Sequence, residues 1–431
     1  MELTNQDYNG ADFGIVPEDW EFVQLNDCLD LLTDYEANGS FESIANNVNI
    51  YDTENFAWFV RATDLENRTK GKDIKYVDKE TYQFLRKTKL FGDEVLITKR
   101  GEIGKVYYFK MRTEFATLAP NLYLLKLNKR VLPFYLYCFF ISPIGVRLLV
   151  EKNASSTLGA LYKDDIKSIS FPLPTKSEQT AIATALSDTD ALIENLEKLI
   201  AKKRNIKQGV MQELLTGRKR LEGFSTEWRY STLSKFVADK KFAIVDGPFG
   251  SQMKVQDFVE QGIPIVEMEH LKNKFLEPDK LDRYITHKKF EELIRSSVFP
   301  DDIIISKTGS LGYISIVPSS IEKALITSRL AKITLDKKKA NISFVFQCLA
   351  RLREIEYWQR TAQGGTMLIL SIANISHAPI PDISIYEQKE IADILDTMDN
   401  DIERLEQILN KYNMIKQGMM QALLTGKIRL V

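Results

Sequence analysis

One helix-like segment occurs twice in this chain, and that repeat restricts the possible folds more than any other feature. Residues 206–217 read IKQGVMQELLTG and residues 415–426 read IKQGMMQALLTG, which differ at two positions and lie 209 residues apart. Extended outward, residues 178–221 align with residues 387–430 without a gap. Internal similarity at a fixed offset indicates a duplicated structural unit. A chain of 431 residues has room for two such units.

Weaker similarity continues into the segment that precedes each conserved stretch. FVRATDL at 59–65 matches IVEMEHL at 265–271, and GDEVLITKRGEIG at 92–104 matches PDDIIISKTGSLG at 300–312. Each unit therefore consists of a divergent globular part and a nearly constant helical part. We predict globular parts at 1–174 and 218–383, and long helices at 175–217 and 384–431.

The pattern of the helical part predicts where each long helix begins and ends. Thr175 and Ser384 are candidate N-caps with Glu three residues later, the arrangement of a capping box. Gly217 and Gly426 are typical of the residue after a helix C-terminus. Between them, apolar residues recur at alternating spacings of four and three, which predicts a coiled-coil seam. The predicted pairing residues are Ile182, Leu186, Ile193, Leu196, Ile200, Ile391, Leu395, Met398, Ile402, Leu405 and Leu409.

The connections between the parts favour an antiparallel pair of helices. Each helix of about 40 residues is roughly 60 Å long, and a compact domain of this size is narrower than that. The second globular part joins the end of one helix to the start of the other, so both junctions belong at the same end of the pair. We predict an α+β protein with two mixed α/β domains, two long antiparallel helices and pseudo-twofold symmetry, with Val431 ending near residues 12–20.

Glycine recurs inside both predicted helices, at Gly209 and Gly418. Each costs about 1 kcal/mol relative to Ala. The repetition predicts a close approach at these positions, either by the partner helix or by another protein.

No catalytic or metal-binding motif is evident. The chain lacks GxxxxGK[ST] and GxGxxG, and His270, His287 and His377 are not spaced like metal ligands. Asp382, Glu387 and Lys389 imitate a nuclease PD…ExK pattern, but the first copy lacks the Asp and the Lys. The scattered cysteines and the absence of a leader at the N-terminus predict a reduced, cytoplasmic protein. The apolar run at 131–150 contains two prolines and an arginine, which favours buried core helices over a membrane span.

Positive charge is concentrated in the globular parts. Residues 61–130 contain 17 basic and 9 acidic residues, and residues 228–380 contain 22 and 17, whereas the second helix is acidic. Basic residues interleaved with aromatic ones suit a nucleic-acid backbone. The two glycine-containing segments are predicted to be hairpins whose tips reach bases or phosphates, with later polar loops in the same role. The candidate DNA-binding residues are Arg61, Lys99, Arg100, Lys105, Ser156, Thr157, Lys254, Lys307, Thr308, Ser310, Arg329 and Thr366.

This pattern resembles the DNA-specificity subunit of type I restriction-modification enzymes over nearly the whole chain. The resemblance rests on the paired EQ…LLTG helices, the two hairpins, the stretch DGPFGSQMK at 246–254, and Trp20 and Trp228 at the start of the two units. It implies a subunit without catalysis of its own, in which each target-recognition domain reads one half of a bipartite, asymmetric duplex DNA site.

The same resemblance implies partners. The helices are expected to set the distance between the half-sites and to bind two adenine methyltransferase subunits, which motor-nuclease subunits then join. No cofactor is expected on this chain, because S-adenosylmethionine, ATP and Mg would belong to the partner subunits. Two alternatives remain at this level. One is a scaffold that joins proteins through its helices and reads peptides, and the other is a nuclease that uses Asp382, Glu387 and Lys389.

Overall fold

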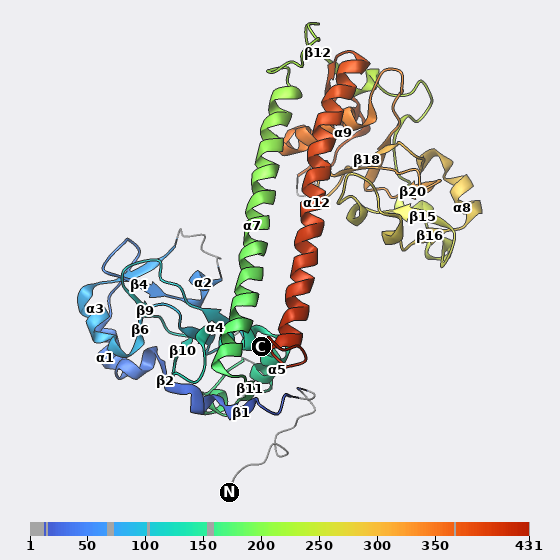
Figure 1. Ribbon diagram of the computed structural model, residues 1–431. Coiled ribbons are helices and arrows are strands. Elements are labelled where there is room, and N and C mark those ends of the chain that lie inside the picture. Colours follow the sequence, from blue (N-terminus) through green and yellow to red (C-terminus); the bar gives the residue numbers. More distant parts are fainter. Residues whose placement is uncertain are drawn as a thin grey trace. The chain divides into compact units, whose positions relative to one another are not determined.

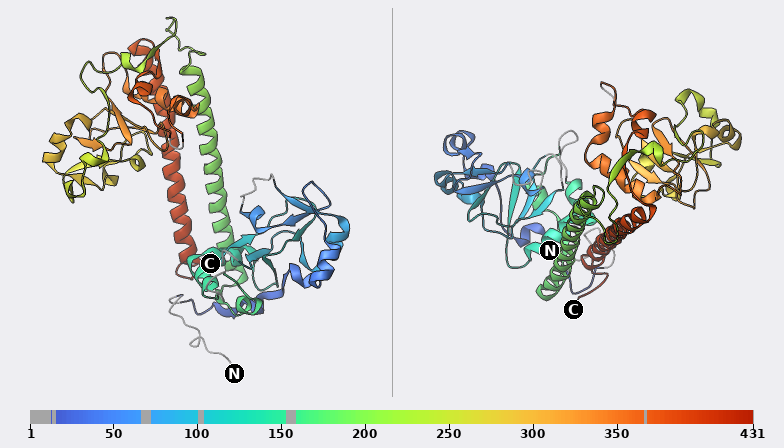
Figure 2. Two further views of the ribbon diagram at one scale, coloured as in Figure 1. Left: turned by 180° about the vertical axis from the view of Figure 1, so that it is seen from behind. Right: turned by 90° about the horizontal axis from the view of Figure 1, so that it is seen from above.

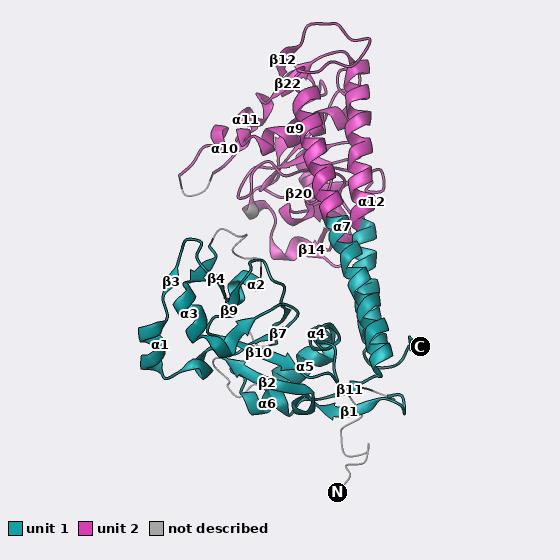
Figure 3. Cartoon of the chain, turned by 60° about the vertical axis from the view of Figure 1, so that its left-hand side comes forward, with its two compact units in different colours: residues 1–197, 407–431 teal, residues 198–406 magenta. Residues whose placement is uncertain are grey.

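The computed structural model describes residue 13 and residues 16–66, 73–100, 104–152, 159–365 and 368–430 (Figure 1). The chain divides into two compact units, residues 1–197 with 407–431 and residues 198–406 (Figure 3). Each unit thus combines a globular part with segments of both long helices. The fold is mixed α/β with two sheet-containing domains, as the sequence predicts.

Unit 1 contains three sheets. A four-stranded antiparallel sheet has the order β2 (Leu29–Asp34), β10 (Leu122–Leu127), β7 (Val95–Thr98) and β8 (Val106–Tyr108). A five-stranded sheet has the order β3 (Ile50–Tyr51), β5 (Lys75–Val77), β4 (Ala57–Val60), β9 (Ala116–Leu118) and β6 (Lys89–Leu90), in which only β4 and β9 are parallel. The ribbon β1 (Glu21–Gln24) and β11 (Ser170–Leu173) leads into the first long helix.

Unit 2 repeats this topology strand for strand. Its four-stranded sheet has the order β13 (Ile244–Asp246), β21 (Leu330–Ile333), β18 (Ile303–Ser306) and β19 (Ile314–Ile316). Its five-stranded sheet has the order β14 (Phe258–Val259), β16 (Tyr284–Ile285), β15 (Ile263–Val266), β20 (Ala324–Ile326) and β17 (Ser297–Val298). Its ribbon pairs β12 (Arg229–Thr232) with β22 (Pro379–Asp382). The weak similarity between the globular parts therefore reflects one shared fold.

Short helices cover the sheets and connect their strands. In unit 1 they are α1 (Phe41–Asn47), α2 (Ala62–Leu65), α3 (Lys79–Phe84), α4 (Pro133–Ile141), α5 (Pro143–Glu151) and α6 (Lys163–Lys167). In unit 2 they are α8 (His287–Glu292), α9 (Ile342–Glu354), α10 (Tyr357–Thr361) and α11 (Ile372–Ser376).

The apolar run at 131–150 forms α4 and α5, whose axes are bent by 77° at Ser142. Phe139, Phe140 and Leu149 of this run are buried in the core of unit 1, which confirms the prediction of core helices. In the described part of the chain, no single helix is long and apolar enough to cross a membrane, although this bent pair passes by length and composition.

The two long helices are α7 (Lys176–Leu214) and α12 (Ile385–Leu423), each of 39 residues. The side chains of Thr175 and Ser384 accept the backbone N–H of the Glu three residues on, at 3.3 and 3.2 Å. Gly217 and Gly426 have φ of +70° and +73° after the helices, the left-handed backbone that glycine adopts without strain. Both ends of both helices thus follow from local sequence.

Within each unit, the two long helices pair antiparallel (Figure 2). In unit 1, Asp190 forms an ion pair with Lys416 and Thr189 contacts Met419. In unit 2, residue numbers again rise along α7 as they fall along α12, because Lys203 pairs with Asp401 and Lys207 with Asp399. Of the predicted pairing residues, Ile182, Leu186, Ile200, Ile391, Leu395 and Ile402 are buried, whereas Ile193, Leu196, Met398, Leu405 and Leu409 are half-buried.

Near the start of each long helix, a buried glutamate binds an arginine and a tryptophan from other segments of the chain. We call this set of contacts the clasp. In unit 1, the buried Glu178 carboxylate accepts Trp20 Nε1 at 2.9 Å and Arg429 Nε at 2.6 Å, and Arg429 also bonds Asp19. In unit 2, Arg220 bonds Glu387 through two nitrogens at 2.9 Å, and Trp228 Nε1 lies 3.4 Å from the same carboxylate. Arg220, in the segment after α7, and Arg429, in the segment after α12, thus make equivalent contacts with Glu387 and Glu178.

The clasp corrects the capping-box prediction in one respect. The N-cap hydroxyls bond as predicted, but the Glu carboxylates bind guanidinium and indole donors, because these donors approach the buried carboxylates in both units. The prediction for Val431 falls on a residue outside the described ranges; Arg429, two residues earlier, contacts Asp19.

The prediction that the partner helix closely approaches Gly209 and Gly418 is wrong. No atom lies within 4 Å of a Cβ added at Gly209 or Gly418. Both positions lie on the outward face of their helices, because the seam between α7 and α12 uses other residues, so the partner helix does not approach them.

Candidate nucleic-acid interface

Three chain segments meet at the end of the four-stranded sheet in each unit. In unit 1 they are the β7–β8 hairpin, the turn between β9 and β10, and the segment that precedes α6. Lys99 donates its backbone N–H to Asn121 O at 2.9 Å, and Lys99 O accepts the N–H of Leu161 at 3.1 Å. We call this meeting point the tip junction.

Unit 2 contains the same tip junction. Lys307 at the end of β18 donates its backbone N–H to Arg329 O at 2.8 Å and accepts the N–H of Leu370 at 2.8 Å. Isolated bridges extend each junction by one residue, between Arg100 and Ala160 in unit 1 and between Thr308 and Ile369 in unit 2. The hairpins therefore converge with residues 160–161 and 369–370, which are described residues at the ends of the two predicted polar loops.

The side chain of Lys99 turns inward from the hairpin. Its Nζ lies 2.9 Å from Asp34 Oδ2 and 2.6 Å from Glu36 Oε2, and the side chain is only 13% exposed. Lys163 of α6 lies 2.9 Å from the other oxygen of Asp34. Burial alone raises the pKa of Asp34, but the hydrogen bonds from both lysines outweigh burial and lower it. Burial likewise favours a lower pKa for Lys99, and its two carboxylate partners raise it instead, so the group stays charged.

Lys307 makes the corresponding contact in unit 2. Its Nζ lies 3.0 Å from Asp246 Oδ2 with a side chain that is 14% exposed, and Arg295 Nη2 lies 2.9 Å from Asp246 Oδ1. Asp246 begins the DGPFGSQMK stretch, where a Cβ at Gly247 would lie 2.1 Å from Thr327 O. That glycine is required because two backbone segments touch there. We call the Asp34–Lys99 and Asp246–Lys307 ion pairs the carboxylate latches.

Two other candidate cations are also paired within their own unit. Arg61, at the N-terminus of α2, places Nη2 2.8 Å from Asp64 Oδ1. Lys105, on the second arm of the unit 1 hairpin, places Nζ 2.7 Å from Glu66 Oε1. The expectation that the hairpin tips present Lys99, Lys105 and Lys307 outward is therefore wrong, because carboxylates distant in sequence take up these ammonium groups.

The remaining described candidates lie at the surface. Arg100 and Arg329 are exposed at the two tip junctions, Ser310 is exposed at the unit 2 tip, and Thr308 is half-buried beside it. Lys254 is exposed and precedes the short turn at Val255–Asp257. Ser156, Thr157 and Thr366 lie outside the described residues.

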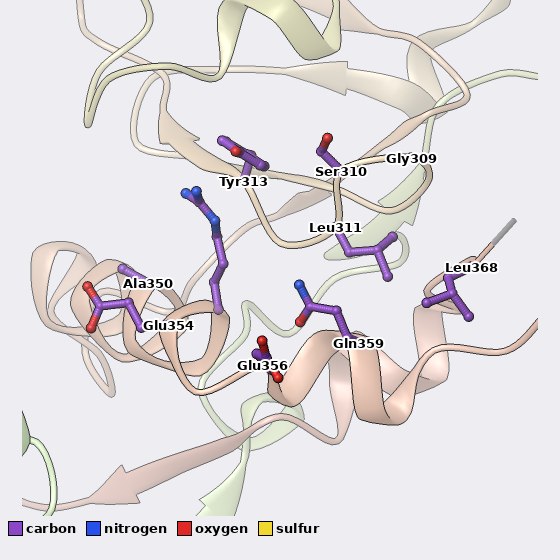
Figure 4. Close-up of a pocket in the computed structure, with 10 residues that line it drawn as sticks. Gly309, Ser310, Leu311, Tyr313, Ala350, Glu354, Glu356, Gln359 and Leu368 are labelled. Carbon is purple, nitrogen blue, oxygen red and sulfur yellow. The ribbon is translucent and has the colours of Figure 1, made fainter. Parts of the chain in front are cut away.

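A cavity lies next to the hairpin in each unit. In unit 2, a cavity of about 570 Å³ lies between the β18–β19 tip and helices α9 and α10 (Figure 4). Arg353 stacks on Tyr313 there, 3.5 Å from the ring centre, and Ser310 and Gln359 line the same cavity. Burial raises the pKa of Glu354 at its edge. In unit 1, a cavity of about 500 Å³ lies between the hairpin and helices α4 and α5, next to Lys105 and Tyr107.

Sequence reasoning missed the two aspartates that form the latches. Asp34 is 4% exposed and ends β2, and Asp246 ends the equivalent strand β13. The available signal was an aspartate after an apolar strand in both copies, LLTD at 31–34 and AIVD at 243–246.

Two of the three residues that imitate a nuclease motif, Asp382 and Glu387, are engaged in structural contacts, and the third, Lys389, is exposed. Glu387 is buried in the clasp with Arg220, and Asp382 accepts hydrogen bonds from Lys235 and Ser231. The bonds from Lys235 and Ser231 outweigh burial and lower the pKa of Asp382.

Small and apolar residues recur on the outward faces of the long helices. Ile206 is 46% exposed and Ile415 is 39% exposed, and each lies three residues before a bare glycine, Gly209 or Gly418. Residues three apart share one helix face. Unit 2 carries the first of these patches and unit 1 carries the second.

Comparison with known proteins identifies relatives over the whole chain. The family model described as type I restriction modification DNA specificity domain matches residues 17–203 and 252–413. The chain is 27% identical to the MjaX specificity subunit of a type I restriction enzyme from Methanocaldococcus jannaschii, over 99% of this chain and 97% of the relative. It is 23% identical to the MjaVIII specificity subunit of the same organism, over 96% and 94%.

Two solved structures have a similar fold. The type I restriction-modification S subunit from M. genitalium aligns with a TM-score of 0.58 and 17% identity, over 98% of both chains. A chain from a study of complex assembly and conformational transition of the type I R-M system aligns with a TM-score of 0.56 and 14% identity, over 96% of this chain and all of that chain.

Proposed function

Because the chain belongs to the type I restriction-modification DNA specificity family and is a non-catalytic specificity subunit, we propose that it reads a bipartite, asymmetric duplex DNA site. Each globular part reads one half of the site through its tip junction. The exposed Arg100, Arg329 and Ser310 provide hydrogen-bond donors for base edges and phosphates.

One observation carries the asymmetry. The backbone hydrogen bonds of the tip junction are equivalent in both units, but the side chains on it and beside it differ. Arg100 corresponds to Thr308, Asn121 to Arg329, and Lys105 to Tyr313. A common frame with different donors reads two different short sequences, so the two half-sites should not be related by symmetry.

The outward patches on the helices support docking of two partner subunits. A bare glycine next to an exposed isoleucine allows the backbone of another protein to approach closely, and there is one such patch in each unit. We assign these patches to two adenine methyltransferase subunits, which motor-nuclease subunits join. S-adenosylmethionine, ATP and Mg belong to those partners, and the assembly works in the cytoplasm.

Methylation mapping tests this function directly. The chain would be combined with its methyltransferase partner, and adenine methylation would be located in a random DNA library. The expected product is methylation at a site with two unlike halves separated by a fixed spacer. Methylation without sequence preference, or at an inverted repeat, would refute the proposal.

Binding without the partners separates this function from a peptide-reading scaffold. The affinity of the chain for duplex DNA should fall steeply as salt rises, because phosphate contacts release counterions. A chain with no salt-dependent affinity for duplex DNA would favour the scaffold.

A further inference from the structure

The aspartate of each carboxylate latch binds the hairpin lysine and a second cation from another segment of the chain. Asp34 holds Lys99 of the hairpin and Lys163 of α6, which follows the polar loop. Asp246 holds Lys307 of the hairpin and Arg295, which precedes β17. The same arrangement occurs in both units although the second cation comes from different segments. The conserved element is therefore the aspartate–lysine pair itself.

Each latch lysine is directly linked to one exposed arginine. In unit 1, Arg100 follows Lys99 in the chain. In unit 2, Arg329 is joined to Lys307 by a backbone hydrogen bond of 2.8 Å. The positions are exchanged between the units, since Asn121 stands where unit 2 has Arg329, and Thr308 stands where unit 1 has Arg100. Within the described ranges, neither arginine side chain has a hydrogen-bond or ion-pair partner.

Stability alone does not account for the latches. A buried ion pair loses in desolvation much of what it gains in attraction, so its net contribution is small, and fixing one geometry is its best-attested use. A recognition group must be held within about 0.5 Å of its productive position by supporting contacts. The latch lysine provides such support, because its side chain is anchored to the aspartate while its backbone carries or holds the arginine.

We propose that Asp34 and Asp246 are positioning residues for sequence reading, which through Lys99 and Lys307 hold Arg100 and Arg329 against a base edge in the major groove. Guanine is the base whose two acceptors match a guanidinium group. This inference rests on the proposed function and deepens it, since it assigns one guanine-reading arginine to each unit.

The test uses the full-length chain with its methyltransferase partner and two probes. The first is a duplex selected from a random library by the unaltered complex, and the second is a duplex of equal length without that site. Arg100→Gln should weaken binding to the selected duplex about tenfold, as expected for the loss of one bidentate contact, and should relax the preference at one guanine. Its effect on the second duplex should be small.

Asp34→Asn distinguishes positioning from simple electrostatics. It removes a negative charge and breaks the ion pairs of Asp34 with Lys99 and Lys163, while Lys99 keeps its contact with Glu36, so binding to the duplex without the site should stay equal or become tighter. Binding to the selected duplex should nevertheless weaken about as much as with Arg100→Gln. In the Arg100→Gln background, Asp34→Asn should cause no further loss, because the group that it positions is already gone.

Matched variants keep the test independent of stability. Glu94→Gln alters a carboxylate that caps the turn before β7 through the N–H groups of Phe91 and Gly92 and touches no latch. It should leave sequence preference unchanged. Asp246→Asn and Arg329→Gln repeat the comparison in unit 2 and should affect only the other half-site.

The outcomes are separable. If the losses of affinity caused by Asp34→Asn and Arg100→Gln add fully in the double variant, the positioning role is overturned while the proposed function stands. The same holds if Glu94→Gln causes the same loss of sequence preference. An unaltered complex that selects no sequence would overturn the proposed function, and with it the inference.

Discussion

Replacing the two interior helix glycines by alanine should stabilise the free chain. Glycine costs about 1 kcal/mol relative to alanine inside a helix, because the unfolded glycine backbone has more freedom to lose. An added Cβ at Gly209 or Gly418 meets no atom within 4 Å, so overpacking does not offset the gain. Gly209 belongs to unit 2 and Gly418 to unit 1, and independent sites add, so the double variant should gain about 2 kcal/mol in total.

Thermal unfolding of the full chain measures this gain. For a unit of about 200 residues, 1 kcal/mol corresponds to a rise in Tm of about 2–4 °C. Calorimetry should show each single variant raising Tm and the double variant raising it at least as much. The control is Gly217→Ala, where φ is +70° and the new Cβ would lie 2.7 Å from Trp228 Cδ2. This control should lower Tm.

A fall in Tm for Gly209→Ala would refute the reasoning, because it would show that the face is covered in the free chain. The same substitutions separate stability from assembly. If a methyltransferase subunit approaches the glycine face, the larger Gly209→Leu should weaken assembly in analytical ultracentrifugation while the free chain remains folded. Unchanged assembly would remove the docking assignment.

Three further predictions concern the clasp, the tip junction and the repeat. Hydrogen bonds from Arg429 and Trp20 outweigh burial and hold the pKa of Glu178 below its ordinary value of 4.5, so the stability that it contributes is present above that pH and is lost as the pH falls. Glu178→Gln should therefore lower Tm at neutral pH, with a difference that shrinks below pH 4.5; a constant difference would contradict this. Lys99→Ala should leave the slope of log K against log salt unchanged, because Lys99 is already paired with two carboxylates; a slope lower by about 0.9 would show that Lys99 reaches a phosphate. The fragment 1–221 should dimerise, since Arg220 of one copy can replace Arg429 in the clasp of the other, and with the methyltransferase partner it should methylate an inverted repeat; a fragment that stays monomeric at high concentration would count against interchangeable halves.

Local and repeated patterns were sufficient to predict the architecture. The gapless repeat predicted two equivalent units, and the structure has the same strand order in both. Thr175, Ser384, Gly217 and Gly426 mark the helix ends because capping depends on contacts within one turn. Such contacts join residues three or four apart, so their pattern can be read directly from the chain.

Only the tertiary structure decided where the charged groups point. Lys99 was expected at an exposed tip, but Asp34, 65 residues earlier, holds its ammonium group. Glu178 was expected to complete a capping box, but its carboxylate binds Arg429, which lies 251 residues later in the chain. The sequence pattern predicted a close helix contact at Gly209, yet no atom lies within 4 Å of a Cβ added there. A long flexible side chain takes the partner that folding brings near it, and no local spacing encodes that partner, so the sequence determined the frame and the fold determined which groups remain exposed on it.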